Sequence, residues 1–334
     1  MKYRAQNPWC SPLPDSPTCE ESSAMSVPDS CLLTIPISDD LRLAAIRSGA
    51  EDAPATVVYI HGLLCDGRYW ASVTEHVHER LGGLISQIVF DQRGHGRSGS
   101  PDRRSVTTLH HLVDDLDAVM AHTTGDVVLV THSAGSLLAG AYAQHHPTRA
   151  AALSALVMFS GAGEFPEFPS LPGHYRTVIT KLPRWRHTRL DGVAVVATAM
   201  AQRRFRRVSQ RLGSKANLVC GTQRADSRVL TDVLGAYGSF TLDSDVAAVL
   251  GRIPTFVIAG ERDRIVPPAQ SVRLADKIQA DYELLPGVGH SLPHAQPARA
   301  AEAVVQALAV ASRRHSDLLV AAVREAAVEG SESR

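Results

Sequence analysis

Residues 129–136, "LVTHSAGS", hold the turn from which the fold can be worked out. An apolar run ends at Ser133, which stands between a histidine and an alanine, and a glycine follows. The pattern is one glycine short of G-x-S-x-G, the strand-to-helix turn that presents a catalytic serine, because Thr131 stands in the place of the first glycine. The stretch therefore raises the question of whether Ser133 is a nucleophile.

Apolar runs and helical patterns alternate on both sides of this stretch. Six runs, rich in Val, Ile and Leu without polar alternation, predict strands that are buried on both faces. They cover residues 55–62, 85–96, 126–133, 153–161, 253–263 and 281–290. Residues 105–122 and 133–147 carry helical patterns between them. Strands that alternate with helices predict an α/β fold, with a mostly parallel sheet covered by helices on both sides.

One long region interrupts the alternation and suggests how the chain is divided. Residues 164–240 begin with a proline-rich stretch and continue with a helical pattern, which predicts a helical cap inserted into the core. The core then consists of residues 33–163 and 241–312. Residues 1–32, rich in proline, serine and acids, predict a disordered leader, and residues 313–334 predict a C-terminal helix with a frayed tail.

Charge and composition exclude several classes of function. The chain has 34 Lys and Arg against 34 Asp and Glu, so no overall field favours nucleic acid or a membrane. No apolar run approaches the ~20 residues of a transmembrane helix, and the N-terminus lacks the apolar core of a signal peptide. The five cysteines form no C-x-x-C pair, which fits reduced thiols and predicts a cytoplasmic protein.

The neutral total conceals an uneven distribution of charge. The stretch from His174 to Arg228 contains 13 Lys and Arg against two acids, a net charge of +11, which leaves −11 on the remainder. A solvated basic face that pairs with the acidic body is one interpretation. The other is that the cap attracts an anionic partner, such as an acyl-CoA, an acyl carrier protein or an anionic lipid surface.

Reactive residue types gather where the predicted strands end. Ser133 follows the third strand, Asp263 ends the fifth and His290 ends the sixth. Ligands of such sheets bind at the carboxyl ends of the strands, so these side chains are expected to lie close together. The chain order Ser, Asp, His is the order of the α/β-hydrolase triad.

Five pieces of sequence carry a resemblance to a known family. They are "HG" at 61–62, "DQRGHGRS" at 91–98, "THSAG" at 131–135, "GERDRIVP" at 260–267 and "GVGHS" at 287–291. Across roughly residues 33–312 the chain resembles an α/β-hydrolase of the lipase/esterase type with a cap. The resemblance implies that Ser133 is the nucleophile, His290 the base and Asp263 the group that orients His290. It also implies an oxyanion hole formed by the backbone amides of Leu63 and Ala134.

Thr131 is the point at which the sequence departs from the usual turn. The strand and the helix nearly touch there, so small residues are needed two positions before and two after the serine. Gly135 meets this need, whereas Thr131 adds a β-branched side chain. A degenerate turn in an inactive relative would explain this. Since the acid, the base and the second glycine are all present, we interpret Ser133 as active and Thr131 as tolerated by a slightly wider gap.

Several other residues near the predicted triad have predicted roles outside the reaction itself. Leu64, Trp70 and His132 are candidates for the substrate pocket, although an aromatic residue at the position of Trp70 is more often part of the core. Asp91 is interpreted as structural rather than as a second acid, and His61 as a residue that orders the oxyanion loop. The chain contains no H-E-x-x-H spacing and no phosphate-binding glycine motif, so we expect no metal and no cofactor.

These residues predict a serine hydrolase that cleaves a carboxylic ester through an acyl-serine intermediate, acting on a small-molecule acyl substrate. Epoxide hydrolases and haloalkane dehalogenases use aspartate at the turn, so Ser133 argues against them. Thioesterases, lactonases and cofactor-free haloperoxidases or perhydrolases use the same triad and remain alternatives. A non-catalytic ligand-binding relative is a more remote alternative.

Overall fold

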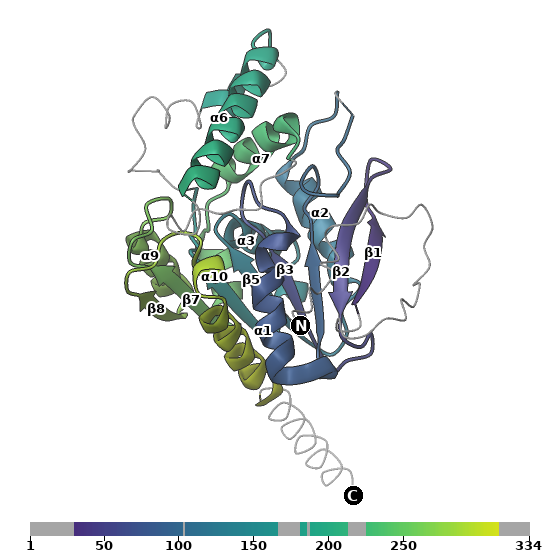
Figure 1. The fold of residues 1–334 in the computed structure, drawn as a ribbon, viewed down its shortest axis with the longest axis vertical. Helices are drawn as coiled ribbons and strands as arrows, with labels where there is room; N and C mark the ends of the chain where they lie inside the picture. Colours follow the sequence, from purple (N-terminus) through teal and green to yellow (C-terminus); the bar gives the residue numbers. More distant parts are fainter. Residues whose placement is uncertain (1–29, 103, 166–180, 186–187, 213–224, 314–334) are drawn as a thin grey trace, which may run out of the picture.

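The computed structural model describes residues 30–102, 104–165, 181–185, 188–212 and 225–313, without the side chains of residues 182–183 and 204–212. Its centre is an eight-stranded sheet in the order β1-β2-β4-β3-β5-β6-β7-β8. All pairings from β4 to β8 are parallel. Helices cover both faces of the sheet, and two further helices lie beyond the ends of the strands (Figure 1). The prediction of a mostly parallel α/β sheet is confirmed.

Each of the six predicted strands is present. They are β3 (Ala55–Ile60), β4 (Ser86–Phe90), β5 (Asp126–His132), β6 (Ala155–Phe159), β7 (Thr255–Gly260) and β8 (Asp281–Leu285). The prediction that all six are buried on both faces is wrong for β8, an edge strand that is mostly exposed or half-buried. The chain passes from β3 outward to β4 and then returns to place β5 on the other side of β3. At such a reversal, two neighbouring loops diverge and leave space for a ligand. The loops after β3 and β5 begin at His61 and Ser133, so the reversal places these two residues together.

The sequence did not predict the two strands at the other edge of the sheet. β1 (Ser30–Pro36) and β2 (Arg42–Ser48) form an antiparallel hairpin, and β2 pairs with β4. Residues 30–32 therefore belong to a strand, which corrects the predicted boundary of the leader at residue 32. β1 is an edge strand and is mostly only half-buried, so it lacks the continuous apolar run by which the inner strands are recognised.

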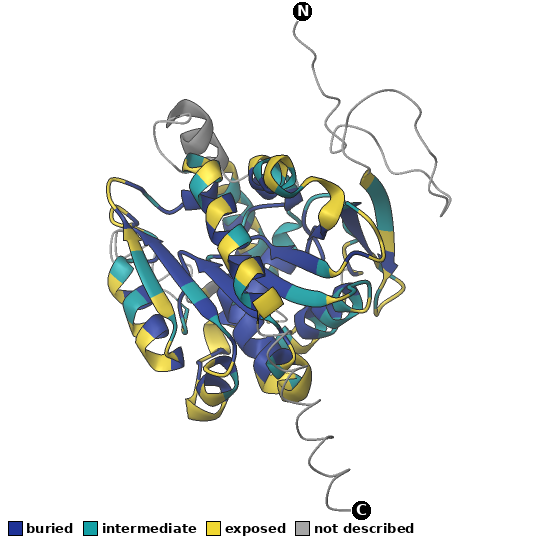
Figure 2. Ribbon diagram, turned by 90° about the horizontal axis from the view of Figure 1, so that it is seen from below, coloured by how far each residue is buried: buried dark blue, intermediate teal, exposed yellow. Residues whose placement is uncertain are grey.

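Two apolar layers hold the helices against the sheet, and the buried residues form a continuous interior (Figure 2). The first layer joins the sheet to α2 (Leu109–Met120), α3 (Gly135–His145), α4 (Pro147–Ala151), α8 (Ser244–Leu250) and α9 (Pro268–Ile278). The second joins the opposite face to α1 (Ala71–Leu81), α10 (Leu292–Ala295) and a helix over 297–313. Three short 3-10 turns lie at η2 (Gly67–Trp70), η3 (Gly82–Leu84) and η4 (Leu182–Trp185).

In the described part of the predicted cap region, two helices lie between β6 and β7. α6 (Asp191–Leu212) and α7 (Ser227–Ser239) pack together, and the hydroxyls of Thr198 and Thr231 are bonded at 2.8 Å between them. α7 rests on the glycine loop that follows β4, where Asp226 N donates to Gly94 O at 2.7 Å. No helix among the residues described is long and apolar enough to cross a membrane.

The contact between α7 and the glycine loop yields a stability test. Gly94 has φ +70°, and a Cβ added there would lie 2.6 Å from Val229 Cγ1. We expect Gly94→Ala to lower the free energy of unfolding by about 1–3 kcal/mol, through backbone strain and overpacking. Urea denaturation measures this. Gly192→Ala in α6 is the matched control, because nothing lies within 4 Å of its added Cβ. Equal stability of the two variants would contradict the packing of α7 on this loop.

Candidate active site

Ser133 occupies a strained turn between β5 and α3. Its φ of 54° lies in the left-handed region, which is unfavourable for a residue with a side chain. Hydrogen bonds hold the turn on both sides. Ser133 N donates to Phe159 O at 2.9 Å, and the backbone N and the Oγ of Ser136 donate to Ser133 O at 2.9 and 2.7 Å. The turn therefore presents the Ser133 side chain at the end of the sheet.

Two glycines allow the neighbouring backbone to approach Ser133. A Cβ added to Gly135 would lie 3.0 Å from Ile60 O, so helix α3 passes very close to strand β3. A Cβ added to Gly62 would lie 3.1 Å from Ser133 Cβ and 2.9 Å from His132 Nδ1. The loop after β3 therefore passes directly over the serine, which explains why the "HG" and "THSAG" pieces occur together.

Thr131 is accommodated within the sheet. It is fully buried and pairs with Ile60 of β3 and Met158 of β6. Its Oγ1 has no hydrogen-bond partner among the residues described. The turn at Ser133 thus forms with a β-branched residue two positions earlier, as the sequence interpretation expected.

Three side chains that were predicted from separate strands meet at Ser133. His290 Nε2 lies 3.0 Å from Ser133 Oγ, and His290 Nδ1 lies 2.8 Å from Asp263 Oδ2. The other oxygen of Asp263 accepts hydrogen bonds from Ile265 N and Val266 N at 2.9 and 3.0 Å. Burial alone would raise the pKa of Asp263, but the charge of His290 and these hydrogen bonds outweigh it and lower the pKa below its usual range. Asp263 is therefore an anion fixed beside the imidazole.

The two residues predicted to form the oxyanion hole lie on the two segments that meet at the serine. Ala134 precedes the first residue of α3, where backbone N–H groups have no partner within the helix, and Leu63 follows Gly62. Neither amide donates a hydrogen bond within the described part of the chain. The next residue, Leu64, is half-buried and has a φ of 62°. The arrangement offers two donors for a developing negative charge, and that role is a prediction.

The remaining candidate residues lie in the interior. Trp70 has no exposed surface and packs in the second core layer, with its ring centroid 5.3 Å from that of Tyr59, so its burial does not support a role in an open pocket. His132 is also buried, and its Nε2 lies 2.9 Å from His290 O. Among the residues described, no cluster of three or more His, Cys, Asp or Glu side chains could hold a metal ion.

Asp91 and His61 hold the loops around the site. Asp91 accepts hydrogen bonds from Gly67 N at 2.6 Å and Arg97 N at 2.8 Å, so it joins the loops after β3 and β4. Burial raises the pKa of Asp91 to about 6, although these two hydrogen bonds act to lower it. His61 Nε2 accepts a hydrogen bond from Gln92 N at 3.1 Å, and burial lowers the pKa of His61 to about 3. Asp91 and His61 thus join neighbouring loops, and the ordering of the oxyanion loop by His61 stays a prediction.

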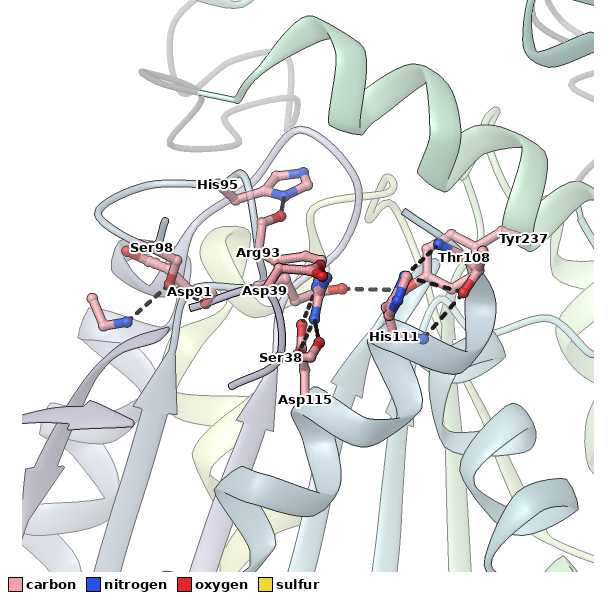
Figure 3. Close-up of polar contacts among 12 residues, drawn as sticks. Ser38, Asp39, Asp91, Arg93, His95, Ser98, Thr108, His111, Asp115 and Tyr237 are labelled. Atoms are coloured by element: carbon pink, nitrogen blue, oxygen red, sulfur yellow. Dashed lines mark hydrogen bonds and ion pairs between the residues drawn. The ribbon is translucent and has the colours of Figure 1, made fainter. Parts of the chain in front are cut away.

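A buried arginine that the sequence analysis did not single out joins three elements. The Arg93 guanidinium binds both oxygens of Asp115 in α2 at 2.6 Å, and also Asp39 at 3.2 Å and Ser38 at 3.0 Å (Figure 3). The β1–β2 turn, the glycine loop and α2 are thereby held together. Arg93 belongs to the quoted "DQRGHGRS" motif, but the motif alone does not identify its distant partners.

Comparisons with known proteins agree with this architecture. A model of the "Alpha/beta hydrolase family" matches residues 57–303. The "Probable oxidoreductase EphD" of Mycobacterium tuberculosis is 36% identical over 102 residues, which are 30% of this chain and 16% of that protein. The chain thus spans only a small part of that relative. "Proline iminopeptidase PfmaB" of Pestalotiopsis fici is 27% identical over 75% of this chain and 90% of its own length.

Solved structures share the fold. A thermophilic esterase from Thermogutta terrifontis has a TM-score of 0.62 at 23% identity, over 84% of this chain and 99% of its own. The enol-lactonase from Burkholderia xenovorans has a TM-score of 0.56 at 20% identity, over 83% and 100%. A thioesterase domain from the curacin biosynthetic pathway has a TM-score of 0.57 at 18% identity, over 83% and 99%. At these identities the likeness establishes the fold alone.

The family match covers most of the chain and includes all three residues that meet at Ser133. The chain belongs to the alpha/beta hydrolase family, and the prediction of an enzyme of this fold is confirmed.

The unpartnered hydroxyl of Thr131 gives the second prediction. Thr131→Val replaces a buried hydroxyl by a methyl group of similar shape, so we expect the free energy of unfolding to rise by about 1 kcal/mol. Thr131→Gly restores the usual turn and is expected to keep activity. Urea denaturation and ester hydrolysis measure the two effects. Loss of activity by both variants with the fold intact would mean that the hydroxyl takes part in the chemistry.

Proposed function

We propose that the protein is a serine hydrolase that cleaves a carboxylic ester bond through an acyl-serine intermediate. The observation that carries the proposal is the position of His290, between the hydroxyl of Ser133 and the carboxylate of Asp263. A serine hydroxyl is a weak nucleophile unless a base accepts its proton during attack. An imidazole can accept that proton, and a fixed carboxylate stabilises the imidazolium that forms.

The reaction proceeds in two acyl transfers. Ser133 Oγ attacks the ester carbonyl while His290 Nε2 takes its proton, and the carbonyl oxygen becomes an oxyanion that the amides of Leu63 and Ala134 stabilise. The intermediate collapses, His290 protonates the leaving alcohol, and the acyl group stays on Ser133. Water, deprotonated by His290, then attacks the acyl-serine and releases the carboxylic acid. The proton returns to Ser133 Oγ.

An ester is the substrate that we favour among the acyl bonds this site can attack. Esterases are among the structures that share the fold, as are a lactonase and a thioesterase. Thioesters and lactones present the same carbonyl to the serine, and perhydrolysis needs peroxide in place of water. A non-catalytic ligand-binding protein would have no use for a complete set of nucleophile, base and acid. We also propose a cytoplasmic location, on the cysteine pattern alone.

Removal of each member of the triad gives the third prediction. Ser133→Ala and His290→Ala are each expected to lower kcat by ~10⁴-fold or more, and Asp263→Asn by somewhat less. Double variants should lose no more than the single ones, because the three side chains act as a unit. Rates are measured on p-nitrophenyl esters of graded chain length, beside acyl-CoA thioesters and lactones.

A labelled fluorophosphonate identifies the nucleophile directly, and adduct formation should occur at Ser133. Ser154→Ala is the matched control, because Ser154 bonds to Asp126 at the other end of β5 and should leave labelling unchanged. A wild-type protein that is not labelled at Ser133 would disprove the enzymatic mechanism. If Asp263→Asn kept the wild-type rate, the acid would be another residue.

We further propose that the cap binds an anionic partner, as its charge suggests. Four large apolar side chains at the start of α6 are 47–65% exposed: Leu190, Val193, Val196 and Met200. Arg189 and Arg203, at the two ends of this group, are also exposed. The other basic residues of α6 have side chains outside the described part. An apolar helix face next to basic residues fits an anionic lipid surface better than a soluble acyl-CoA or an acyl carrier protein.

Binding to vesicles gives the fourth prediction. In a Ser133→Ala background, the protein should sediment with vesicles of phosphatidylcholine containing phosphatidylglycerol, and less so as salt rises. Replacing Val193, Val196 and Met200 together by serine should weaken binding about tenfold or more. Leu84→Ser is the matched control, since Leu84 is 72% exposed and lies on η3, away from the cap. Equal binding by the cap variant and the control would exclude a lipid surface.

A further inference from the structure

The backbone carbonyl of His290 accepts hydrogen bonds from two side chains that the triad does not include. His132 Nε2 lies 2.9 Å from this oxygen, and Ser160 Oγ lies 3.2 Å from it. His132 is the last residue of β5, and Ser160 directly follows β6. Both donors are buried, so the ends of two central strands converge on the backbone of the residue that carries the imidazole.

Ser160 makes this contact from an unfavourable backbone conformation. Its φ is 50°, in the left-handed region where glycine is favoured, and its N–H donates to Ile258 O at 2.8 Å. A glycine would adopt this φ without a steric penalty. Serine in its place supplies a hydroxyl that donates to His290 O. A strained residue beside an active site is a reason to look for a role of its side chain.

His132 is fixed by contacts on the faces and edges of its ring. The ring stacks on Tyr69 with centroids 4.5 Å apart, and its centroid lies 4.8 Å from that of His290. Nδ1 faces the backbone of Gly62 and has no hydrogen-bond partner among the residues described. A donor is needed at the carbonyl of His290, so the neutral ring carries its proton on Nε2.

The surroundings of His132 keep it neutral while His290 changes its protonation. Burial first, and then the charge of His290, lower the pKa of His132 to about 3, and His61 acts in the same direction. The hydrogen bond to His290 O and the nearby Asp263 oppose this shift without cancelling it. The ring therefore remains a neutral donor beside an imidazole that takes up a proton.

We propose that Ser160 and His132 are positioning residues that fix the backbone of His290 and, through it, the direction of its ring. The proposal rests on the function proposed above. The loop that carries His290 contains Gly287 and Gly289, and two hydrogen bonds tie it to the loop after β7. Arg262 N donates to Val288 O at 2.7 Å, and Gly287 N donates to Glu261 Oε2 at 2.7 Å. A catalytic group misplaced by 1 Å can cost ~10²-fold in rate, so a further anchor at His290 itself is valuable.

The experiment compares variants that remove each donor. Ser160→Gly deletes the hydroxyl and relieves the backbone strain, so it should be no less stable than the wild type. His132→Phe keeps a ring for stacking but removes the donor. We expect each to lower kcat on a p-nitrophenyl ester about tenfold or more with KM little changed. Fluorophosphonate labelling of Ser133 should slow in parallel.

Two further variants separate positioning from general damage. His132→Gln places an amide N–H near the position of Nε2 and should recover part of the kcat that His132→Phe loses. Tyr59→Phe removes a buried hydrogen bond of 2.7 Å to Gln87 elsewhere in the sheet, and should lose stability with kcat unchanged. A purely structural role would lower the stability of the His132 and Ser160 variants and leave their kcat unchanged, as in that control.

The outcomes separate this proposal from the one on which it rests. If the wild type hydrolyses esters and is labelled at Ser133, while folded Ser160→Gly and His132→Phe keep the wild-type kcat, the positioning role is wrong and the hydrolase stands. If the wild type is neither active nor labelled, His290 has no reaction to be positioned for, and both proposals are wrong. A lower kcat that His132→Gln partly restores supports positioning.

Discussion

The left-handed turn at Ser133 is the constraint on which the rest of the site depends. A residue with a side chain adopts this conformation only where its surroundings leave no alternative. Here the backbone of β6 fixes the N–H of Ser133, and the first turn of α3 fixes its carbonyl. The same turn brings α3 against β3 and the loop after β3 over the serine, which requires glycine at positions 62 and 135. The spacing of the motifs along the chain follows from these close approaches.

Burial then determines which of the surrounding groups are charged. His61 and His132 have their pKa lowered to about 3 by burial, so both remain neutral near the imidazole. Asp91 has its pKa raised to about 6 and uses its oxygens to bind backbone amides of two loops. Asp263, in contrast, keeps a lowered pKa because His290 and backbone N–H groups surround it. Asp263 is thus held as the carboxylate that lies beside His290.

The inner strands and the site residues could be predicted because their signals are local. Ser133, Asp263 and His290 stand at or a few residues beyond the carboxyl ends of β5, β7 and β8, so the strand pattern and the family resemblance together were enough to predict that they meet. Thr131 lies two residues before the turn, and the wider gap expected beside it stays a prediction. Sequence alone could not show that it would be buried between two strands.

What the sequence did not predict depends on contacts between distant segments. β1 is mostly exposed or half-buried, and β2 is a short strand that joins the sheet by pairing with β4, more than 35 residues further along the chain. The sequence does not distinguish Arg93 from an exposed loop arginine, because its partner Asp115 lies in α2, 22 residues away. In the sequence, Ser160 is a polar residue after β6 with no recognisable role. The structure shows that its hydroxyl donates to the carbonyl of His290, 130 residues further along the chain.

The same kind of contact connects the cap region to the loop that covers the serine. Tyr237 of α7 donates to Gln92 Oε1 at 3.1 Å, and Gln92 Nε2 donates to His61 O at 2.8 Å. His61 precedes Gly62, and the next residue, Leu63, carries one of the amides proposed to bind the oxyanion. All three side chains are buried or nearly so, which makes each hydrogen bond costly to break. These hydrogen bonds connect α7 of the cap region to the loop that carries Leu63, whose amide we propose stabilises the oxyanion.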